Sequence, residues 1–210
     1  MDGTRLAALV AKGYGIAATH IGTPYTWYRS PTLINSVAPQ YQLGILQASF
    51  AVDSQFKTPP NYQTILYRAF IDTAQVQPGD ILVGQYTMVM LETGPLLPPL
   101  ALISTDRIKI ERASTTAAVG LQAYGAPTTY TTIAQGLPAN INLKKEVGTL
   151  PANLPSDVSR RTYWFASFVA ADGSVKDGDI ITDGEGYRYS VTAANWQSIY
   201  YQCLCERLES

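Results

Sequence analysis

The residues that most often perform catalysis or bind metals are few in this chain. The single histidine, His20, follows an apolar stretch, and its charged form would suit the carboxyl end of a helix. Cys203 and Cys205 are two residues apart, so on a strand they would share one face about 7 Å apart, a poor disulfide geometry. Zinc sites usually need about four nitrogen or sulfur ligands. We therefore expect no metal site, and we interpret both cysteines as small buried residues.

The densest group of acidic residues is the stretch DGSVKDGDIITDGEG, residues 172–186. An EF-hand loop that began with Asp177 and Asp179 would place Ile181 where an oxygen ligand is required. Turns with acidic tips are the better interpretation, with adventitious Ca²⁺ binding as the alternative. Hydrolysis by paired carboxylates needs two acids that face one cleft, and spacing alone does not establish this. The sequence predicts no catalytic residue.

One short run matches a nucleotide-binding pattern. Residues 13–18 read Gly-Tyr-Gly-Ile-Ala-Ala, which fits Gly-x-Gly-x-x-Ala. A dinucleotide fingerprint needs a buried strand before the glycines. Here the preceding residues are helical in pattern, so we discard the match and expect no cofactor.

Three tryptophans, Trp27, Trp164 and Trp196, could stack on sugar rings. Large aromatic side chains more often anchor a core or an interface. The sequence does not show whether the three converge, so a carbohydrate-binding or adhesive β-domain that uses exposed Trp and Tyr is the alternative function.

The elements that position these residues are mainly strands. Leu6, Leu9, Val10, Ile16 and Ala17 recur at helical spacing, which predicts a helix over residues 3–21. We expect a cap near residue 2 and an end around residues 22–24. Residues 24–29 and 44–52 are typical of strands, and residues 62–71 fit either a strand or a short helix.

Two stretches of the chain resemble each other. Residues 76–114 and 175–210 both begin with Val-x-x-Gly-Asp, continue into an alternating strand and reach a Glu-Arg pair, at residues 111–112 and 206–207. A Gly-Asp turn, a strand, a glycine-rich tip and a second strand are typical of a β-hairpin. We interpret them as two related β-units or one quasi-symmetric barrel. Chance similarity between two short hairpins is the alternative.

The charged fraction is unusually low. It is 15%, with 15 basic and 16 acidic residues, whereas soluble domains contain about 25%. This balance argues against sequence-specific nucleic-acid binding, and no apolar run approaches the roughly 20 residues of a membrane span. Ser30–Val52 and Ala113–Leu143 contain no charged residue. They are either uncharged polar loops or segments covered by partner chains, because interface cores are depleted of charge.

Two segments, about a third of the chain, carry a family resemblance: MDGTRLAALVAKGYGIAATHIGTPYTWYRSP and QPGDILVGQYTMVMLETGPLLPPLALISTDRIKIER. Together they resemble small virion proteins of tailed bacteriophages and prophages. The closing GDIITDGEGYRYSVTAANW is similar to barrel strands of head- and tail-completion proteins, a more generic pattern. The resemblance implies a non-enzymatic structural protein of the neck, tail or baseplate, and it transfers no catalytic residue.

We therefore expect a mainly β protein, with small β-barrel or sandwich units, an N-terminal α-helix and long extended loops. The expected units are residues 1–30 (helix and lead-in strand), residues 31–147 (first β unit with a charge-free arm) and residues 148–210 (C-terminal β unit, which could complete one barrel with the first). The expected function is oligomeric assembly in a virion, with copies of itself and other virion proteins as partners. No export signal is visible, so we expect synthesis in the host cytoplasm. The rivals are the carbohydrate-binding domain and a hydrolase that uses Asp or Glu.

Overall fold

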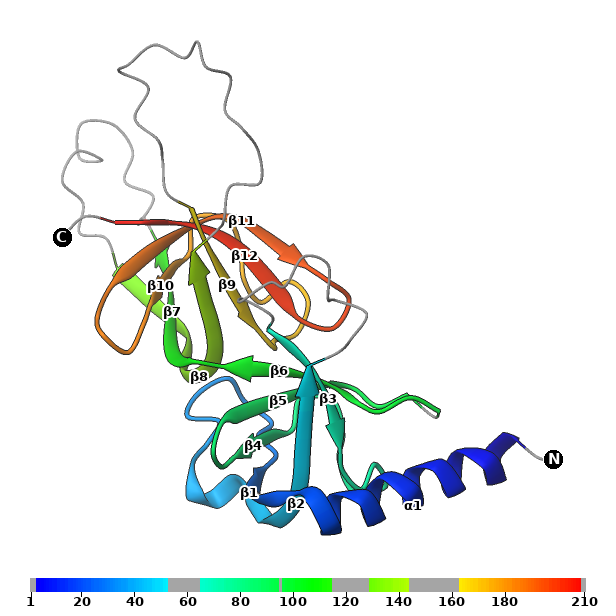
Figure 1. The fold of residues 1–210 in the computed structure, drawn as a ribbon. Helices are drawn as coiled ribbons and strands as arrows, with labels where there is room; N and C mark the ends of the chain where they lie inside the picture. Colours follow the sequence, from blue (N-terminus) through cyan, green and yellow to red (C-terminus); the bar gives the residue numbers. More distant parts are fainter. Residues whose placement is uncertain (1–2, 53–64, 95, 115–128, 144–162, 209–210) are drawn as a thin grey trace, which may run out of the picture.

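The computed structural model describes residues 3–52, 65–94, 96–114, 129–143 and 163–208. These residues form one α-helix, α1 (Gly3–Ile21), a short 3-10 helix (Pro39–Tyr41) and two closed β-barrels of six strands each (Figure 1). The prediction of a mainly β protein with an N-terminal helix is confirmed, and the units are barrels. None of the helices in the described residues is long and apolar enough to cross a bilayer.

The first barrel is built from the amino-terminal half of the chain. Its strands are β1 (Thr23–Tyr28), β2 (Gln42–Val52), β3 (Leu66–Phe70), β4 (Ile81–Val83), β5 (Thr87–Glu92) and β6 (Leu100–Ser104). They are hydrogen-bonded in the order β1-β2-β3-β6-β5-β4, every pair is antiparallel, and β4 closes the barrel by pairing with β1. The strand alternative for residues 62–71 is therefore correct over β3.

The second barrel repeats this arrangement strand for strand. Its strands are β7 (Asp106–Ser114), β8 (Thr129–Leu143), β9 (Tyr163–Phe168), β10 (Ile180–Thr182), β11 (Arg188–Trp196) and β12 (Tyr201–Arg207). The order β7-β8-β9-β12-β11-β10 is that of the first barrel with six added to each number, and β10 closes on β7. The repeated unit of this chain is thus a whole barrel.

The predicted internal similarity is correct in its first half and wrong in its second. Each Gly-Asp turn precedes the same hairpin, β4–β5 or β10–β11, with the predicted glycine-rich tip at residues 183–186. The Glu-Arg pairs are not equivalent, because Glu111-Arg112 lies on β7, the first strand of its barrel, and Glu206-Arg207 lies on β12, the last. The two pairs share residue types and occupy different positions in the two barrels.

The strands also group differently from the expected units. The chain passes from one barrel to the other between Ser104 and Asp106, inside the stretch 31–147. β1, which the expected units assign to residues 1–30, belongs to the same barrel as β2–β6. Strand pairing between distant segments sets these groups, and local sequence pattern does not report it.

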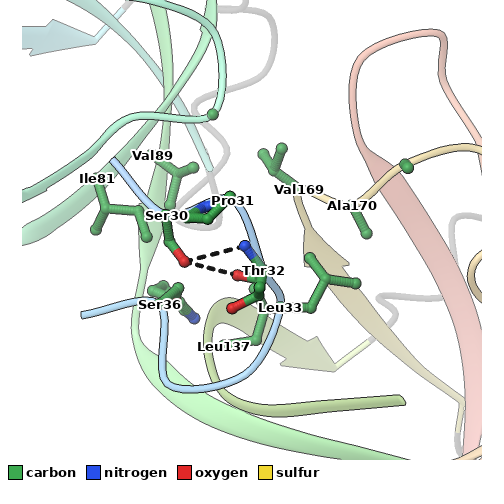
Figure 2. A pocket seen from close by; sticks show the side chains of 13 residues that line it. Ser30, Pro31, Thr32, Leu33, Ser36, Ile81, Val89, Leu137, Val169 and Ala170 are labelled. Carbon is green, nitrogen blue, oxygen red and sulfur yellow. Dashed lines mark hydrogen bonds between the residues drawn. The ribbon is translucent and has the colours of Figure 1, made fainter. Parts of the chain in front are cut away.

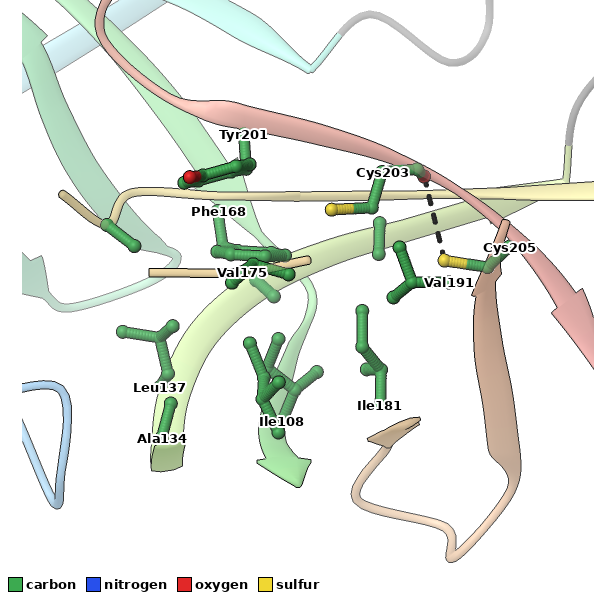
Figure 3. Packing of buried hydrophobic residues seen from close by; sticks show 14 of the residues in the cluster. Ile108, Ala134, Leu137, Phe168, Val175, Ile181, Val191, Tyr201, Cys203 and Cys205 are labelled. Carbon is green, nitrogen blue, oxygen red and sulfur yellow. Dashed lines mark hydrogen bonds between the residues drawn. The ribbon is translucent and has the colours of Figure 1, made fainter. Parts of the chain in front are cut away.

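Each barrel encloses its own apolar core. Tyr25, Ala48, Leu82, Met88 and Met90 are among the buried residues of the first core. In the second core, the rings of Phe168 and Tyr201 stack with centroids 5.7 Å apart, and the Cys203 and Cys205 side chains lie beside Ile181 and Val191 (Figure 3). Alternating residues along each strand supply these side chains, as expected for a small barrel filled by its own residues.

The two barrels are joined by hydrogen bonds as well as by the chain. The Thr105 amide donates to the Ala139 carbonyl at 2.9 Å, and the buried Asn140 side chain donates to the Ile103 carbonyl at 3.1 Å. A third apolar cluster, which includes Ile81, Val89 and Leu102, packs against Val169 and Tyr200 of the other barrel. Because these hydrogen bonds and this apolar cluster both span the junction, the barrels form a packed pair.

Candidate assembly surface

The sequence candidates for catalysis and metal binding do not converge. His20 is exposed in the last turn of α1. Cys203 and Cys205 are fully buried free thiols on β12. Burial raises the pKa of Cys203 above its ordinary value and that of Cys205 to about 12. Within the described ranges, no group of three or more His, Cys, Asp or Glu side chains could hold a metal ion.

Carboxylates of the acidic stretch 172–186 accept hydrogen bonds that stabilise turns. Asp183 accepts hydrogen bonds from the Glu185 amide at 3.0 Å, the Tyr187 amide at 2.8 Å and the Tyr189 hydroxyl at 3.0 Å. Asp177 accepts one from the Ala194 amide at 2.8 Å. These contacts fit the interpretation of turns with acidic tips, since each carboxylate satisfies donors of its own barrel.

Sequence reasoning missed a buried ion pair in the first barrel. The Asp80 carboxylate is 1% exposed and accepts four hydrogen bonds, from Arg29 Nε at 2.7 Å, Arg29 Nη2 at 2.8 Å, Trp27 Nε1 at 2.9 Å and the Gln77 amide at 2.8 Å. The hydrogen bonds to Asp80 raise the pKa of Arg29. Arg29 follows β1 and Asp80 precedes β4, so the pair joins the two strands that close the barrel.

The second barrel contains the same pair. Asp179 accepts from Arg112 Nε and Nη2, both at 2.8 Å, and from the Lys176 amide at 2.8 Å. Arg112 also donates to the Ser174 carbonyl at 3.0 Å, as Arg29 does to the Gln75 carbonyl. The repeated Gly-Asp sequence was the signal in the sequence for the two aspartates of these ion pairs. The arginine of each pair lies two positions after Trp27 in the first barrel and after Ile110 in the second. Among the described residues, the two most buried carboxylates are therefore structural.

The three tryptophans do not form one surface. Trp27 packs against the first core and Trp164 against the second, where its ring meets Tyr189 edge-on with centroids 5.7 Å apart. Only Trp196 is among the exposed large apolar residues. Of these three side chains, the carbohydrate-binding alternative therefore rests on Trp196 alone.

The α1 helix has two apolar faces, and only one touches the barrel. Tyr14 meets Phe70 with ring centroids 6.0 Å apart, and Ala18 is the one buried residue of the helix. Ala7 and Ala11 share this face by helical spacing. The larger side chains Leu6, Leu9 and Ile16 are exposed, with Leu9 at 57% and Ile16 at 51%. The apolar pattern that predicts the helix is therefore directed largely away from the barrel.

An open groove lies between α1 and the barrel. It has a volume of about 600 Å³. Ala8, Lys12 and Ile16 line its helix side, and Ile45 and Asp72 are on the opposite side. Ile45 is 68% exposed on the outer face of β2. Figure 1 shows the amino-terminal part of α1 extending beyond the barrel. We use the name α1 surface for the exposed apolar residues of the helix and of β2, together with the groove that Ile16 and Ile45 help to line: Leu6, Leu9, Ile16, Leu43 and Ile45.

The charge-free stretches have different surroundings. Ser30–Val52 contributes Leu43 and Ile45 to the α1 surface. Ala113–Leu143 lies partly outside the described residues, and its described part is largely β8, where Leu137 and Ala139 are buried in the second core. Burial in the second core explains the lack of charge at Leu137 and Ala139, whereas Tyr130 and Leu143 of the same strand are exposed. Coverage of either stretch by a partner remains a prediction.

A smaller cavity of about 260 Å³ lies at the junction of the barrels (Figure 2). Its lining includes the apolar side chains of Leu33, Ile81, Leu137 and Val169. The Ser30 hydroxyl, also in the lining, donates a hydrogen bond to the Thr32 carbonyl and accepts one from the Thr32 amide. The buried Ser36 hydroxyl has no hydrogen-bond partner within the described residues. The cavity is small and mostly apolar.

No family model matches this chain, and neither the curated proteins nor the solved structures include a significant match.

Proposed function

We propose that the chain is a non-enzymatic structural subunit that acts by oligomeric assembly, as a component of the neck, tail or baseplate of a tailed-phage virion. The observation that carries the proposal is the α1 surface. A helix of 19 residues with one buried residue, beside an exposed Ile45, presents more apolar area than its own barrel covers.

Energetics support a covered state for this surface. Most helical stability in proteins comes from packing of an apolar face rather than from intrinsic helix propensity. Gly13 and Gly15 weaken α1 further. Covering apolar area contributes about 25 cal/mol per Å². Contact with another subunit would therefore stabilise α1 as well as the assembly.

The use of the buried charges also favours a structural role. General acid–base catalysis needs a carboxylate within reach of a substrate proton. Asp80 and Asp179 are both buried and bound to an arginine and a backbone amide. Both carboxylates therefore bind groups of their own barrel and are not placed to meet a substrate.

The resemblance to phage virion proteins supports the same proposal. Its first segment, residues 1–31, includes α1 and β1, so the resemblance and the exposed apolar surface fall on one part of the chain. The proposed location is accordingly the virion.

Mass spectrometry of purified particles tests the proposal. A phage that lacks the gene is complemented with the natural chain, with Leu9→Glu/Ile16→Glu, or with Gln85→Glu as a control at an exposed hairpin tip of the same barrel. We expect the natural chain and the control in particles, and the double variant to be depleted at least about 10-fold because charge at a buried contact is strongly unfavourable. Absence of the natural chain from particles would refute the proposal.

A further inference from the structure

The exposed side of α1 has the residue spacing of a surface that pairs with another helix. Leu6, Leu9, Gly13, Ile16 and His20 follow one another at intervals of three, four, three and four residues, and all five are exposed. This spacing places them in a single stripe, which we call the α1 seam. A strand or loop presents no matching repeat, whereas a second helix does.

The middle of the seam allows close approach. No heavy atom lies within 4 Å of the position that a Cβ would occupy at Gly13. A small residue between Leu9 and Ile16 leaves a hollow into which a large side chain of a facing helix could fit. This alternation of large and small residues is the geometry of helix packing by interdigitation.

Charge distinguishes the partner. Arg5 and Lys12 lie seven residues apart on one flank of the seam, and Gly3–Ile21 contains no acidic residue. No described residue pairs with either side chain. A second copy of α1 would set these cations against each other if antiparallel, and against Val10 and Ala17 if parallel. A partner with acidic residues beside its own seam would complement them.

We propose that the α1 seam binds an amphipathic helix of a different protein, with apolar residues at three-four spacing and glutamate or aspartate beside them. This inference rests on the proposed function, because the helix would belong to a neighbouring component of the assembly. The apolar stripe would supply affinity, and Arg5 and Lys12 would select the partner by charge.

Two designed peptides test the inference with the full-length chain. Both are labelled helices of about three heptads with leucine at the seam positions. One carries glutamate at the flanking positions and the other carries lysine. Fluorescence anisotropy measures binding to the natural chain, to Leu9→Gln, to Lys12→Glu and to the control Gln85→Glu. Circular dichroism verifies that each variant retains its fold.

We expect the glutamate peptide to bind at least about 10-fold more tightly than the lysine peptide, the preference to diminish in high salt, and Lys12→Glu to reduce or invert it. Leu9→Gln should weaken binding about 10-fold, and Gln85→Glu should leave it unchanged. Equal binding of the two peptides, or binding of neither, would overturn the inference.

Sedimentation equilibrium provides the remaining outcome. If the natural chain self-associates and Leu9→Gln abolishes this, the seam serves a second copy and the inference is wrong. In that case particles would still contain the protein and the proposed function would stand, whereas absence from particles would remove both.

Discussion

The substitution Asp80→Ala should destabilise the first barrel more than Asp179→Ala destabilises the second. Asp80 accepts four hydrogen bonds and Asp179 accepts three, and the additional donor is the Trp27 indole. Removal of one member of a buried ion pair costs about 3–5 kcal/mol. The Arg29 side chain is 35% exposed and regains water, so we expect the lower end of this range, about 3 kcal/mol.

The difference between the barrels is the contribution of one hydrogen bond. A buried donor left without its acceptor costs about 1 kcal/mol or more, so Asp179→Ala should cost about 2 kcal/mol. The bond can be isolated by a double-mutant cycle with Trp27→Phe. Trp27→Phe should cost about 1 kcal/mol less in the Asp80→Ala background than in the natural chain, because the acceptor is already absent.

Urea unfolding followed by circular dichroism gives the free energies, and hydrogen exchange read by mass spectrometry locates them. Protection in β1–β6 should fall after Asp80→Ala, and protection in β7–β12 should fall after Asp179→Ala. A change below about 0.5 kcal/mol for both variants, typical of surface substitutions, would refute the reasoning. A larger effect of Asp179→Ala would refute the role assigned to Trp27.

Three further outcomes follow from packing and burial. Gly22→Ala should destabilise the chain by about 2 kcal/mol, because the added Cβ would overlap the Ala18 carbonyl oxygen. The control Gly44→Ala has open space around the added Cβ. It should change the free energy of unfolding by less than about 0.5 kcal/mol in the same urea titration. Cys203 and Cys205 should react with a thiol reagent at pH 8 only after urea unfolds the barrel, and rapid reaction in the native state would contradict their burial. The pKa of Cys205 is about 12 when folded and about 8.5 when unfolded. Its stabilisation is therefore complete below pH 8.5 and declines above it, by about 2 kcal/mol at pH 10. Because burial raises the pKa of Cys203 as well, Cys205→Ala should make the decline shallower without abolishing it, and an unchanged slope would contradict the prediction.

Local signals in the sequence predict local structure well. The spacing of Leu6, Leu9 and Ile16 predicts α1, which ends at Ile21, and Gly22 lies where a residue with a side chain would strike the helix. The Gly-Asp turns are also local features, because Gly79 and Gly178 adopt φ values of 89° and 86°, which disfavour other residues. Each such signal depends on residues within a few positions of one another.

The features that decide the architecture depend on distant residues. Arg29 and Asp80 are 51 positions apart, and Arg112 and Asp179 are 67 apart. Periodicity reports neither these pairs nor the closure of β1 on β4. It also cannot tell which apolar face of α1 packs on the barrel, because the inner face is formed by Tyr14 and small alanines, while Leu6, Leu9 and Ile16 are exposed.

The duplication provides an internal control for the assignment of function. Strand order and the buried Arg–Asp pair occur in both barrels, so these features are what a barrel of this kind requires in order to fold. The α1 helix precedes β1, whereas only Thr105 separates β6 from β7 in the second barrel. A barrel with this strand order therefore closes without such a helix. The presence of α1 on the first barrel, with its larger apolar side chains exposed, needs a reason other than folding, and contact with a neighbouring subunit supplies one.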